Sequence, residues 1–175
     1  MLRAANKKAA SKIVYLMRGA PASGKSFTAR KLAGKTGVVC ETDSYFGPPG
    51  EEYHFDIKKR PQAREQNMGC FLDALMLGRS PVIVDRGCGK GRRTWWYAQT
   101  AILFGYKVKL AEPTSPWWKR MVAWKKRQAE WPVDAVQILS DKQQRTHRVH
   151  CSAIARSLSR YDPTLTIKKI LKGGK

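Results

Sequence analysis

The stretch Gly19-Ala-Pro-Ala-Ser-Gly-Lys-Ser26 determines how the rest of this chain is interpreted. It has the form G-x-x-x-x-G-K-S, which is the Walker A pattern of phosphate-binding loops. An apolar run of strand length, residues 13–18, precedes it, and residues 27–33 follow with a helical pattern. Because the pattern binds phosphate only between a strand and a helix, this setting favours a phosphate-binding loop over a chance match in a glycine-rich turn.

The residue types of this stretch suit a nucleoside triphosphate. Glycine at positions 19 and 24 lets the backbone approach phosphate oxygens closely, and the N–H groups of the loop and the following helix then point at them. Lys25 is expected to reach the β- and γ-phosphates of ATP, and Ser26 to hold Mg²⁺. The predicted nucleotide-binding residues are Gly19, Ala20, Pro21, Ala22, Ser23, Gly24, Lys25, Ser26 and Phe27.

Strand-like and helix-like segments alternate along the rest of the chain. The further predicted strands are residues 38–42, 81–84 and 106–111, and the predicted helices are residues 24–33, 60–77, 92–104, 117–130 and most of 133–158. Residues 164–171 suit either a short strand or a helix. The alternation predicts right-handed βαβ units and an α/β fold, in which helices flank a parallel sheet of four to five strands.

This pattern predicts one P-loop kinase-like domain. It is expected to span residues 13–171, between a basic flexible tail at 1–12 and a flexible C-terminus at 172–175. The predicted helix at residues 117–130 is very basic. No apolar run reaches the roughly 18 residues of a membrane span.

The charge of the chain points to a polyanionic partner. The 34 lysines and arginines outnumber the 13 acids, for a formal net charge of +21. Residues 1–40 contain no acid, whereas eight of the 13 acids lie in residues 41–85. A charge of this size favours RNA or DNA as the partner over the alternative of solvated basic faces.

The four cysteines predict an intracellular, reducing compartment. Cys40, Cys70, Cys88 and Cys151 form no C-x-x-C pair and no cluster with zinc spacing, so no disulfide framework is expected. The cytoplasm or nucleus fits this composition. Residues 1–12 are basic and acid-free, which leaves a mitochondrial targeting segment as an alternative to a tail that contacts nucleic acid.

Two acids follow predicted strands directly. Asp43 comes after the second strand and Asp85 after the third, so both are expected at the carboxyl edge of the sheet, where open α/β sheets bind ligands. The alternative for each is an aspartate that forms a turn or caps a helix. Six tryptophans could stack on nucleic-acid bases, although a single tryptophan more often belongs to the core. Two adjacent pairs, Trp95-Trp96 and Trp117-Trp118, are not all expected to be buried, because neighbouring residues of a helix point in different directions.

Several segments, taken in order, resemble a known family. The segments G-A-P-A-S-G-K-S, E-T-D-S-Y-F, Y-H-F-D, V-I-V-D and E-P-T-S-P-W resemble the AAA-type P-loop kinase-like domain of the Nedd-four-binding-protein-like group. That group is similar to the kinase domain of phage polynucleotide kinase, and the resemblance covers about residues 13–171. It implies phosphoryl transfer from ATP to a hydroxyl, which in polynucleotide kinase is the 5′-OH of RNA or DNA.

The resemblance also implies roles for individual residues. Asp43 matches the family's base for the acceptor hydroxyl, and Asp85 matches the aspartate placed near the magnesium, so Ser26 and Asp85 are the predicted metal site, with Asp85 acting through water. Lys126 and Arg127, together with Lys125, fall where the family has its basic lid helix. The predicted catalytic residues are Asp43, Lys25, Lys126 and Arg127.

Three positions depart from the family pattern. The second aspartate of its D-D-Y segment is Ser44 here, and an arginine that contacts the substrate phosphate is Phe46. The polar D-x-T-N segment reads Asp85-Arg-Gly-Cys in this chain. These departures affect the acceptor side of the site more than the ATP side.

Three functions therefore remain open from the sequence. The first is an ATP- and Mg²⁺-dependent polynucleotide 5′-hydroxyl kinase. The second is a catalytically weak P-loop module that binds nucleic acid within a ribonucleoprotein. The third is a small-molecule kinase, which the net charge of +21 argues against because a small metabolite needs no such field.

Overall fold

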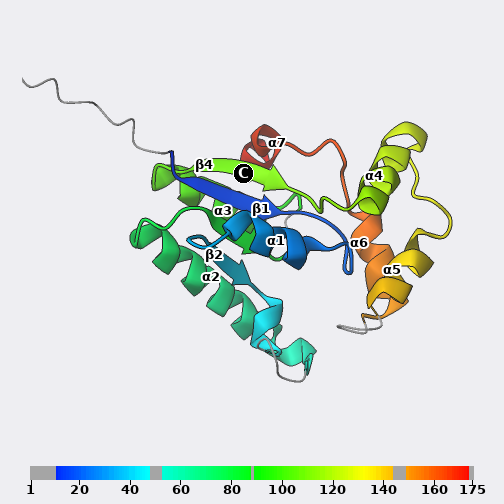
Figure 1. Cartoon of the computed structure of the whole chain (residues 1–175), viewed down its shortest axis with the longest axis horizontal. Helices are drawn as coiled ribbons and strands as arrows, with labels where there is room; N and C mark the ends of the chain where they lie inside the picture. The colour runs from blue at the N-terminus through cyan, green and yellow to red at the C-terminus, as the bar shows by residue number, and fades with distance from the viewer. Residues whose placement is uncertain (1–10, 48–52, 88, 144–148, 174–175) are drawn as a thin grey trace, which may run out of the picture.

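Four parallel strands form the centre of the domain (Figure 1). The computed structural model describes residues 11–47, 53–87, 89–143 and 149–173. The strands lie in the order β2-β3-β1-β4, and all three neighbouring pairs run parallel. Their bounds are β1 Ile13–Met17, β2 Val38–Glu41, β3 Val82–Asp85 and β4 Lys107–Ala111. The predicted α/β fold with a parallel sheet is confirmed.

The described part of the chain contains seven α-helices. They are α1 Lys25–Ala33, α2 Arg60–Met76, α3 Arg92–Leu103, α4 Pro116–Gln128, α5 Ala135–Gln143, α6 Cys151–Ser159 and α7 Ile167–Lys172. Two short 3-10 helices, η1 Asp43–Tyr45 and η2 Ile57–Lys59, lie between β2 and α2.

The C-terminal part differs from the sequence expectation at two places. Residues 133–158, predicted as mainly helical, contain two separate helices, because His150 is extended and its ring nitrogen accepts the N–H of Ser152 to begin α6. The alternative of a strand within residues 164–171 is wrong. There the Thr166 hydroxyl accepts the N–H of Lys169 and begins α7.

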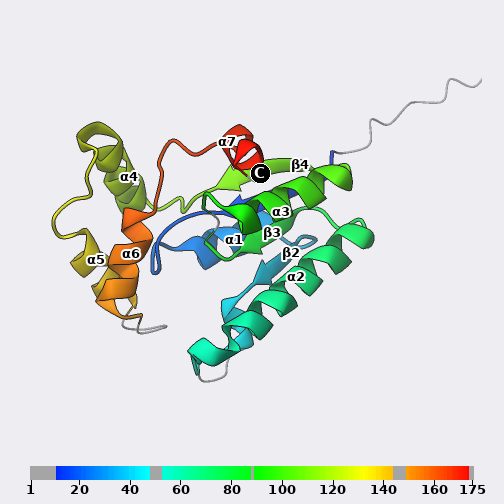
Figure 2. The ribbon, with the colours of Figure 1, turned by 180° about the vertical axis from the view of Figure 1, so that it is seen from behind.

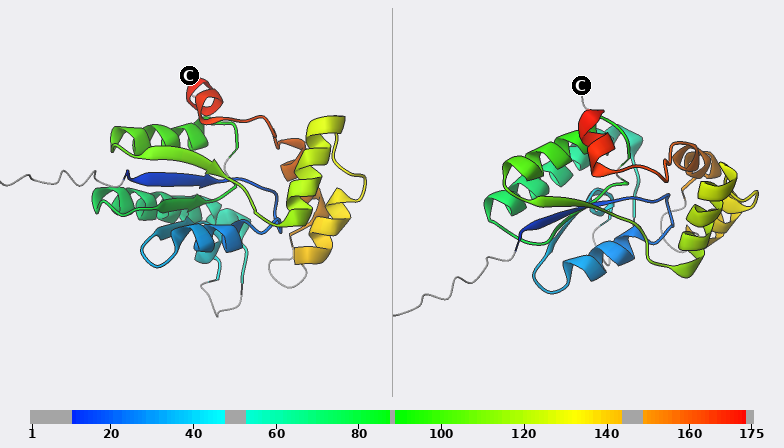
Figure 3. Two further views of the ribbon diagram at one scale, coloured as in Figure 1. Left: turned by 45° about the horizontal axis from the view of Figure 1, so that its top comes forward. Right: turned by 90° about the horizontal axis from the view of Figure 1, so that it is seen from above.

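The two faces of the sheet carry separate layers of helices (Figures 2 and 3). Successive side chains of a strand point to opposite faces. In β3 all four residues are buried: Val82 and Val84 pack toward α2 and α3, whereas Ile83 packs toward α1. A strand that is apolar on both sides is typical of a covered parallel sheet, and this explains why β3 reads as a continuous apolar run.

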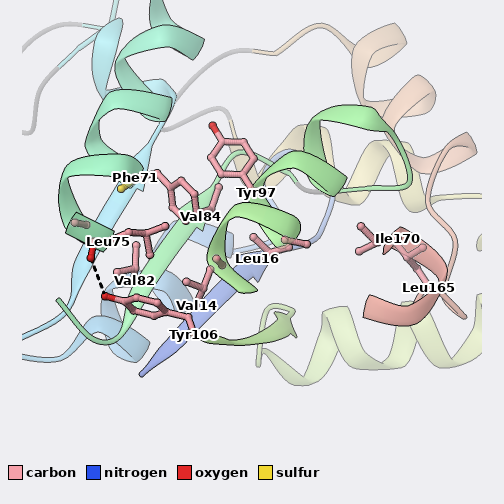
Figure 4. Close-up of a cluster of buried hydrophobic side chains, with 14 residues drawn as sticks. Val14, Leu16, Phe71, Leu75, Val82, Val84, Tyr97, Tyr106, Leu165 and Ile170 are labelled. Atoms are coloured by element: carbon pink, nitrogen blue, oxygen red, sulfur yellow. Dashed lines mark hydrogen bonds between the residues drawn. The ribbon is translucent and has the colours of Figure 1, made fainter. Parts of the chain in front are cut away.

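The larger core lies between the sheet and α2, α3 and α7 (Figure 4). Phe71 of α2 and Tyr97 of α3 meet edge to face, with ring centroids 4.9 Å apart. Tyr106, just before β4, is buried, and its hydroxyl donates hydrogen bonds to the backbone oxygens of Arg79 at 2.9 Å and Leu75 at 3.4 Å. These contacts fix α2 and α3 side by side above the strands.

A second core holds α4, α5 and α6 together beyond the carboxyl ends of β1 and β4 (Figure 1). Its centre is Trp118, which is fully buried and contacts the rings of Trp117, Trp131 and Tyr161. Ala20, in the loop after β1, belongs to the same cluster. The helical unit therefore packs directly on the Gly19–Ser26 loop.

One buried arginine joins this helical unit to the sheet. Arg18, at the end of β1, is 2% exposed, and its Nη1 lies 3.1 Å from the Glu112 carboxylate after β4. Its Nη2 donates to the backbone oxygen of Asp162, and its guanidinium lies 4.6 Å from the ring centroid of Tyr161. Arg18 thus connects two strand ends with the segment that follows α6.

The sequence predicts no disulfide framework, but one pair of cysteines is bonded. Cys40 of β2 and Cys70 of α2 form a disulfide, with Cα atoms 5.7 Å apart. The packing explains the pairing, because the amide of Asn67, one turn before Cys70, donates to the backbone oxygen of Cys40 at 2.6 Å. Cys151 is free and exposed, and Cys88 lies outside the described residues.

Two further sequence expectations concern the ends of the chain and the membrane. Residues 1–10 and 174–175 lie outside the described residues, so the tails expected there stay predictions. In the described ranges, none of the helices has the length and apolar character needed to cross a bilayer.

Trp118 provides a test of the second core. Replacing Trp118 with alanine should lower the free energy of unfolding by about 3–5 kcal/mol, because it removes a fully buried aromatic side chain. Trp124, which is 45% exposed on the same helix, is the matched control, and its change to alanine should cost less than about 1 kcal/mol. Urea unfolding followed by circular dichroism measures both, and equal costs for the two variants would contradict this packing.

Candidate functional site

The loop Gly19–Ser26 bends sharply between β1 and α1. Gly19 has a φ of 138° and Gly24 a φ of 91°, and Ala22 is left-handed with a φ of 61°. A Cβ at residue 19 would lie 2.5 Å from the Ser23 Oγ and 3.2 Å from Pro113. Glycine is therefore required at residue 19 by close packing as well as by its backbone angle.

The start of α1 and the side chain of Lys25 face this loop. No side chain of the described residues caps α1, so the positive end of its dipole and its first N–H groups are directed at the loop. Lys25 Nζ donates to the backbone oxygen of Ala20 at 2.8 Å, which folds the lysine back across the loop. The arrangement gathers positive charge where the sequence predicts phosphate oxygens.

Asp85 is buried at the end of β3, beside Ser26. It is 4% exposed, and burial raises the pKa of its carboxyl, while the charge of Lys25 and a hydrogen bond from Ser26 act in the opposite direction. Its Oδ2 is buried and has no hydrogen-bond partner among the described residues. A buried carboxylate oxygen without a donor, next to a serine hydroxyl, is a chemically suitable neighbour for a hydrated Mg²⁺.

Asp43 lies at the same edge of the sheet, after β2. The N–H of Thr42 donates to the backbone oxygen of Asp85 at 3.2 Å, which holds the ends of β2 and β3 together. Asp43 itself is exposed and begins η1. Its charge contributes to the raised pKa of Asp85, and, after burial, to the raised pKa of Tyr53, which is about 12. The two aspartates predicted from the strand ends are thus within electrostatic reach of each other.

A cavity of about 420 Å³ lies between α1 and the start of α4, and residues of the Gly19–Ser26 loop help to line it. This volume lies within the usual range for small-molecule sites. Phe27, which is 71% exposed, and Trp117 both line the cavity, and the Lys142 ammonium lies 4.7 Å from the ring centroid of Trp117. Aromatic walls of this kind can accept a planar base.

Comparisons with known proteins agree with this fold. No protein-family model matches the chain. Over 109 residues, or 61% of its length, the chain is 37% identical to human NEDD4-binding protein 2, and the match spans 6% of that protein. A chain in the structure of the Pnkp1/Rnl/Hen1 RNA repair complex is similar in fold, with a TM-score of 0.52 and 16% identity, over 90% of this chain and 46% of that one.

The sequence match and the similar fold support a kinase-like domain of the NEDD4-binding protein 2 type in this chain. The domain spans a small part of that protein and less than half of the solved chain. The structure brings together Lys25, Ser26, Asp43 and Asp85, which come from the start of α1 and from the ends of β2 and β3.

The two remaining predicted catalytic residues lie elsewhere in the kinase-like domain. Lys126 and Arg127 are in the last turn of α4, whereas its first turn lines the cavity, so about 15 Å of helix separates them from it. The structure does not bring them to the loop, and their catalytic role stays a prediction. Lys142 of α5 is the basic side chain that lines the cavity, and no spacing pattern in the sequence singled it out.

The buried Asp85 carboxylate predicts a pH-dependent effect on stability. A folded-state pKa above the unfolded value means that the charged carboxylate costs stability at high pH, and this cost vanishes as the pH falls below the unfolded pKa. Asp85→Asn should therefore raise the thermal midpoint of the ligand-free domain at pH 8, by an amount that shrinks toward pH 4. The exposed Asp73→Asn, on α2, is the control and should shift the midpoint little. Calorimetry at several pH values measures both, and a loss of stability for Asp85→Asn at pH 8 would contradict this interpretation.

Proposed function

We propose that this chain is an ATP-dependent kinase that phosphorylates the 5′-hydroxyl of an RNA or DNA strand. The observation that carries the proposal is the placement of Asp43 and Asp85 at one sheet edge, beside Lys25 and Ser26. The net charge of +21 supports a polyanionic acceptor. The similar fold of a chain from an RNA repair complex agrees with such an acceptor.

The loop and the cavity provide the ATP side of the proposed site. Backbone N–H groups within residues 19–27, Pro21 excepted, would receive the phosphates, and the Lys25 ammonium would exchange its contact with Ala20 for the β- and γ-phosphates. The base would enter between Phe27 and Trp117. The Ser26 hydroxyl, together with Asp85 acting through water, would hold Mg²⁺, which neutralises phosphate charge when bound.

Asp43 is the proposed general base on the acceptor side. It is exposed and so accessible to a strand end, and the Thr42 contact with Asp85 holds it near the metal site. In the transfer, a bond forms between the γ-phosphorus and the 5′ oxygen, and the bond to the β–γ bridging oxygen breaks, so ADP leaves. The hydroxyl proton passes to the Asp43 carboxylate.

The test is transfer of label from [γ-³²P]ATP to an oligonucleotide with a 5′-OH end, in the presence of Mg²⁺. The purified protein should label this oligonucleotide but not the same sequence with a 5′-phosphate. Asp43→Asn should lower kcat by about 10²- to 10⁴-fold, because it removes the base, and should leave the binding of ATP unchanged. Asp73→Asn, an exposed acid on α2, is the control and should retain the wild-type rate.

Two outcomes would overturn the proposal in favour of another function. Salt-sensitive oligonucleotide binding without any transfer, persisting in Lys25→Ala, would favour a nucleic-acid-binding module. Turnover of a small-molecule alcohol, with no labelling of oligonucleotides, would favour a metabolite kinase. Full activity in Asp43→Asn would show that another group accepts the hydroxyl proton.

A further inference from the structure

Four arginines from three elements gather at the edge of the sheet that carries Asp43. This arginine cluster consists of Arg60 and Arg64 on α2, Arg86 after β3, and Arg93 on α3. The partial burial of Arg64 lowers the pKa of its guanidinium, and the charges of Arg93, Arg60 and Arg86 lower it further. All four side chains thus contribute to one positive field.

A buried hydrogen bond fixes the geometry of the cluster. The Tyr97 hydroxyl of α3 donates to the Asn67 side-chain oxygen of α2 at 2.6 Å, and this holds the two helices side by side. Arg64 precedes Asn67 by three residues and Arg93 precedes Tyr97 by four, so each arginine lies one turn before the contact, on the same side of its helix. The guanidinium of Arg86 lies over the ring of Tyr97, 5.3 Å from its centroid.

Within the described part of the chain, no member of the cluster forms an ion pair with a carboxylate. The ion pairs found there, Arg18 with Glu112 and Arg30 with Glu41, involve none of its members. Neither α2 nor α3 has an acid in its first turn, although the dipole at a helix start favours anions. The mutual repulsion of the arginines therefore makes an anionic ligand favourable at this place.

The cluster is adjacent to the acceptor side of the proposed site. Arg86 follows Asp85 directly, and the N–H of Thr42 holds the segment that begins with Asp43 against the end of β3. The helix α2, which carries Arg60 and Arg64, also contacts η1, where Asp43 lies. A strand whose 5′-OH reaches Asp43 would pass its next phosphates across this surface.

We propose that the arginine cluster binds the internucleotide phosphates nearest the 5′ end of the acceptor strand. This inference rests on the proposed function, and it specifies that the acceptor must carry at least one phosphodiester beyond its reacting sugar. Guanidinium groups pair with phosphate oxygens through two parallel hydrogen bonds, and they remain charged even when they repel one another. A neutral alcohol or a free nucleoside would leave the repulsion within the cluster in place.

The first experiment measures binding alone. A trinucleotide with a 5′-OH and a 3′ fluorophore is titrated with Arg64→Gln, with Arg93→Gln and with the wild type, by anisotropy at several salt concentrations. Each change should raise Kd about tenfold, because a charged hydrogen-bonding group is lost. It should also reduce the slope of log K against log salt by about 0.7, which is the value for one phosphate contact on a single strand.

The same anisotropy titration provides a control at a distant arginine. Arg79 is exposed between α2 and β3, at the opposite edge of the sheet, so Arg79→Gln should match the wild type in Kd and in slope. The thermal midpoints of Arg64→Gln and Arg93→Gln should not fall, since each change relieves repulsion. If Arg64→Gln and Arg93→Gln both kept the Kd and the salt slope of the wild type, the inference would be overturned.

A second experiment separates this inference from the proposed function. If the wild type transfers phosphate, a nucleoside 3′-phosphate diester should be a much better acceptor than the nucleoside, and Arg64→Gln should reduce this preference by raising KM for the diester while leaving KM for ATP unchanged. Equal use of both acceptors by the wild type would refute the phosphate site and leave the kinase intact. Absence of any transfer would refute the kinase, and the binding measurement would still decide the role of the arginines.

Discussion

The burial of Asp85 is the constraint on which the site depends. Its backbone oxygen receives the N–H of Thr42, its carboxyl accepts a hydrogen bond from Ser26, and its second carboxylate oxygen has no donor among the described residues. A buried carboxylate in this state is costly for a folded chain, and such costs are typically retained where a bound ion or substrate offsets them. Through these contacts one residue joins the phosphate loop to the segment that carries Asp43, so the donor and acceptor sides are built around a common centre.

The helical unit of α4, α5 and α6 is connected to the same loop from the other side. Ala20 packs into the core around Trp118, and Arg18, just before the loop, is held by Glu112 and the backbone of Asp162. The loop therefore contacts both the sheet and the helical unit, and a ligand between Phe27 and Trp117 would touch both. A ligand at the loop would therefore contact the unit that contains α4, the helix on which the predicted lid residues Lys126 and Arg127 lie.

The sequence predicted those parts of the molecule that depend on local patterns. Short apolar runs and glycine positions predicted the strand–loop–helix unit around Gly19–Ser26 and the strands that end at Glu41 and Asp85. These predictions succeeded because each depends only on residues that are neighbours in the sequence. Some contacts arise only when distant segments pack together, and no spacing pattern in the sequence predicts them. They are the Cys40–Cys70 disulfide, the link from Arg18 to Asp162 and the cluster of arginines from α2 and α3.

The most direct measurement is a crystal structure of the protein with Mg²⁺, a non-hydrolysable ATP analogue and a short 5′-OH oligonucleotide. The account predicts the β- and γ-phosphates within the Gly19–Ser26 loop, the metal between Ser26 and waters held by Asp85, and the 5′ oxygen about 3 Å from the Asp43 carboxylate. An analogue bound away from this loop, or an acceptor end directed away from Asp43, would contradict it.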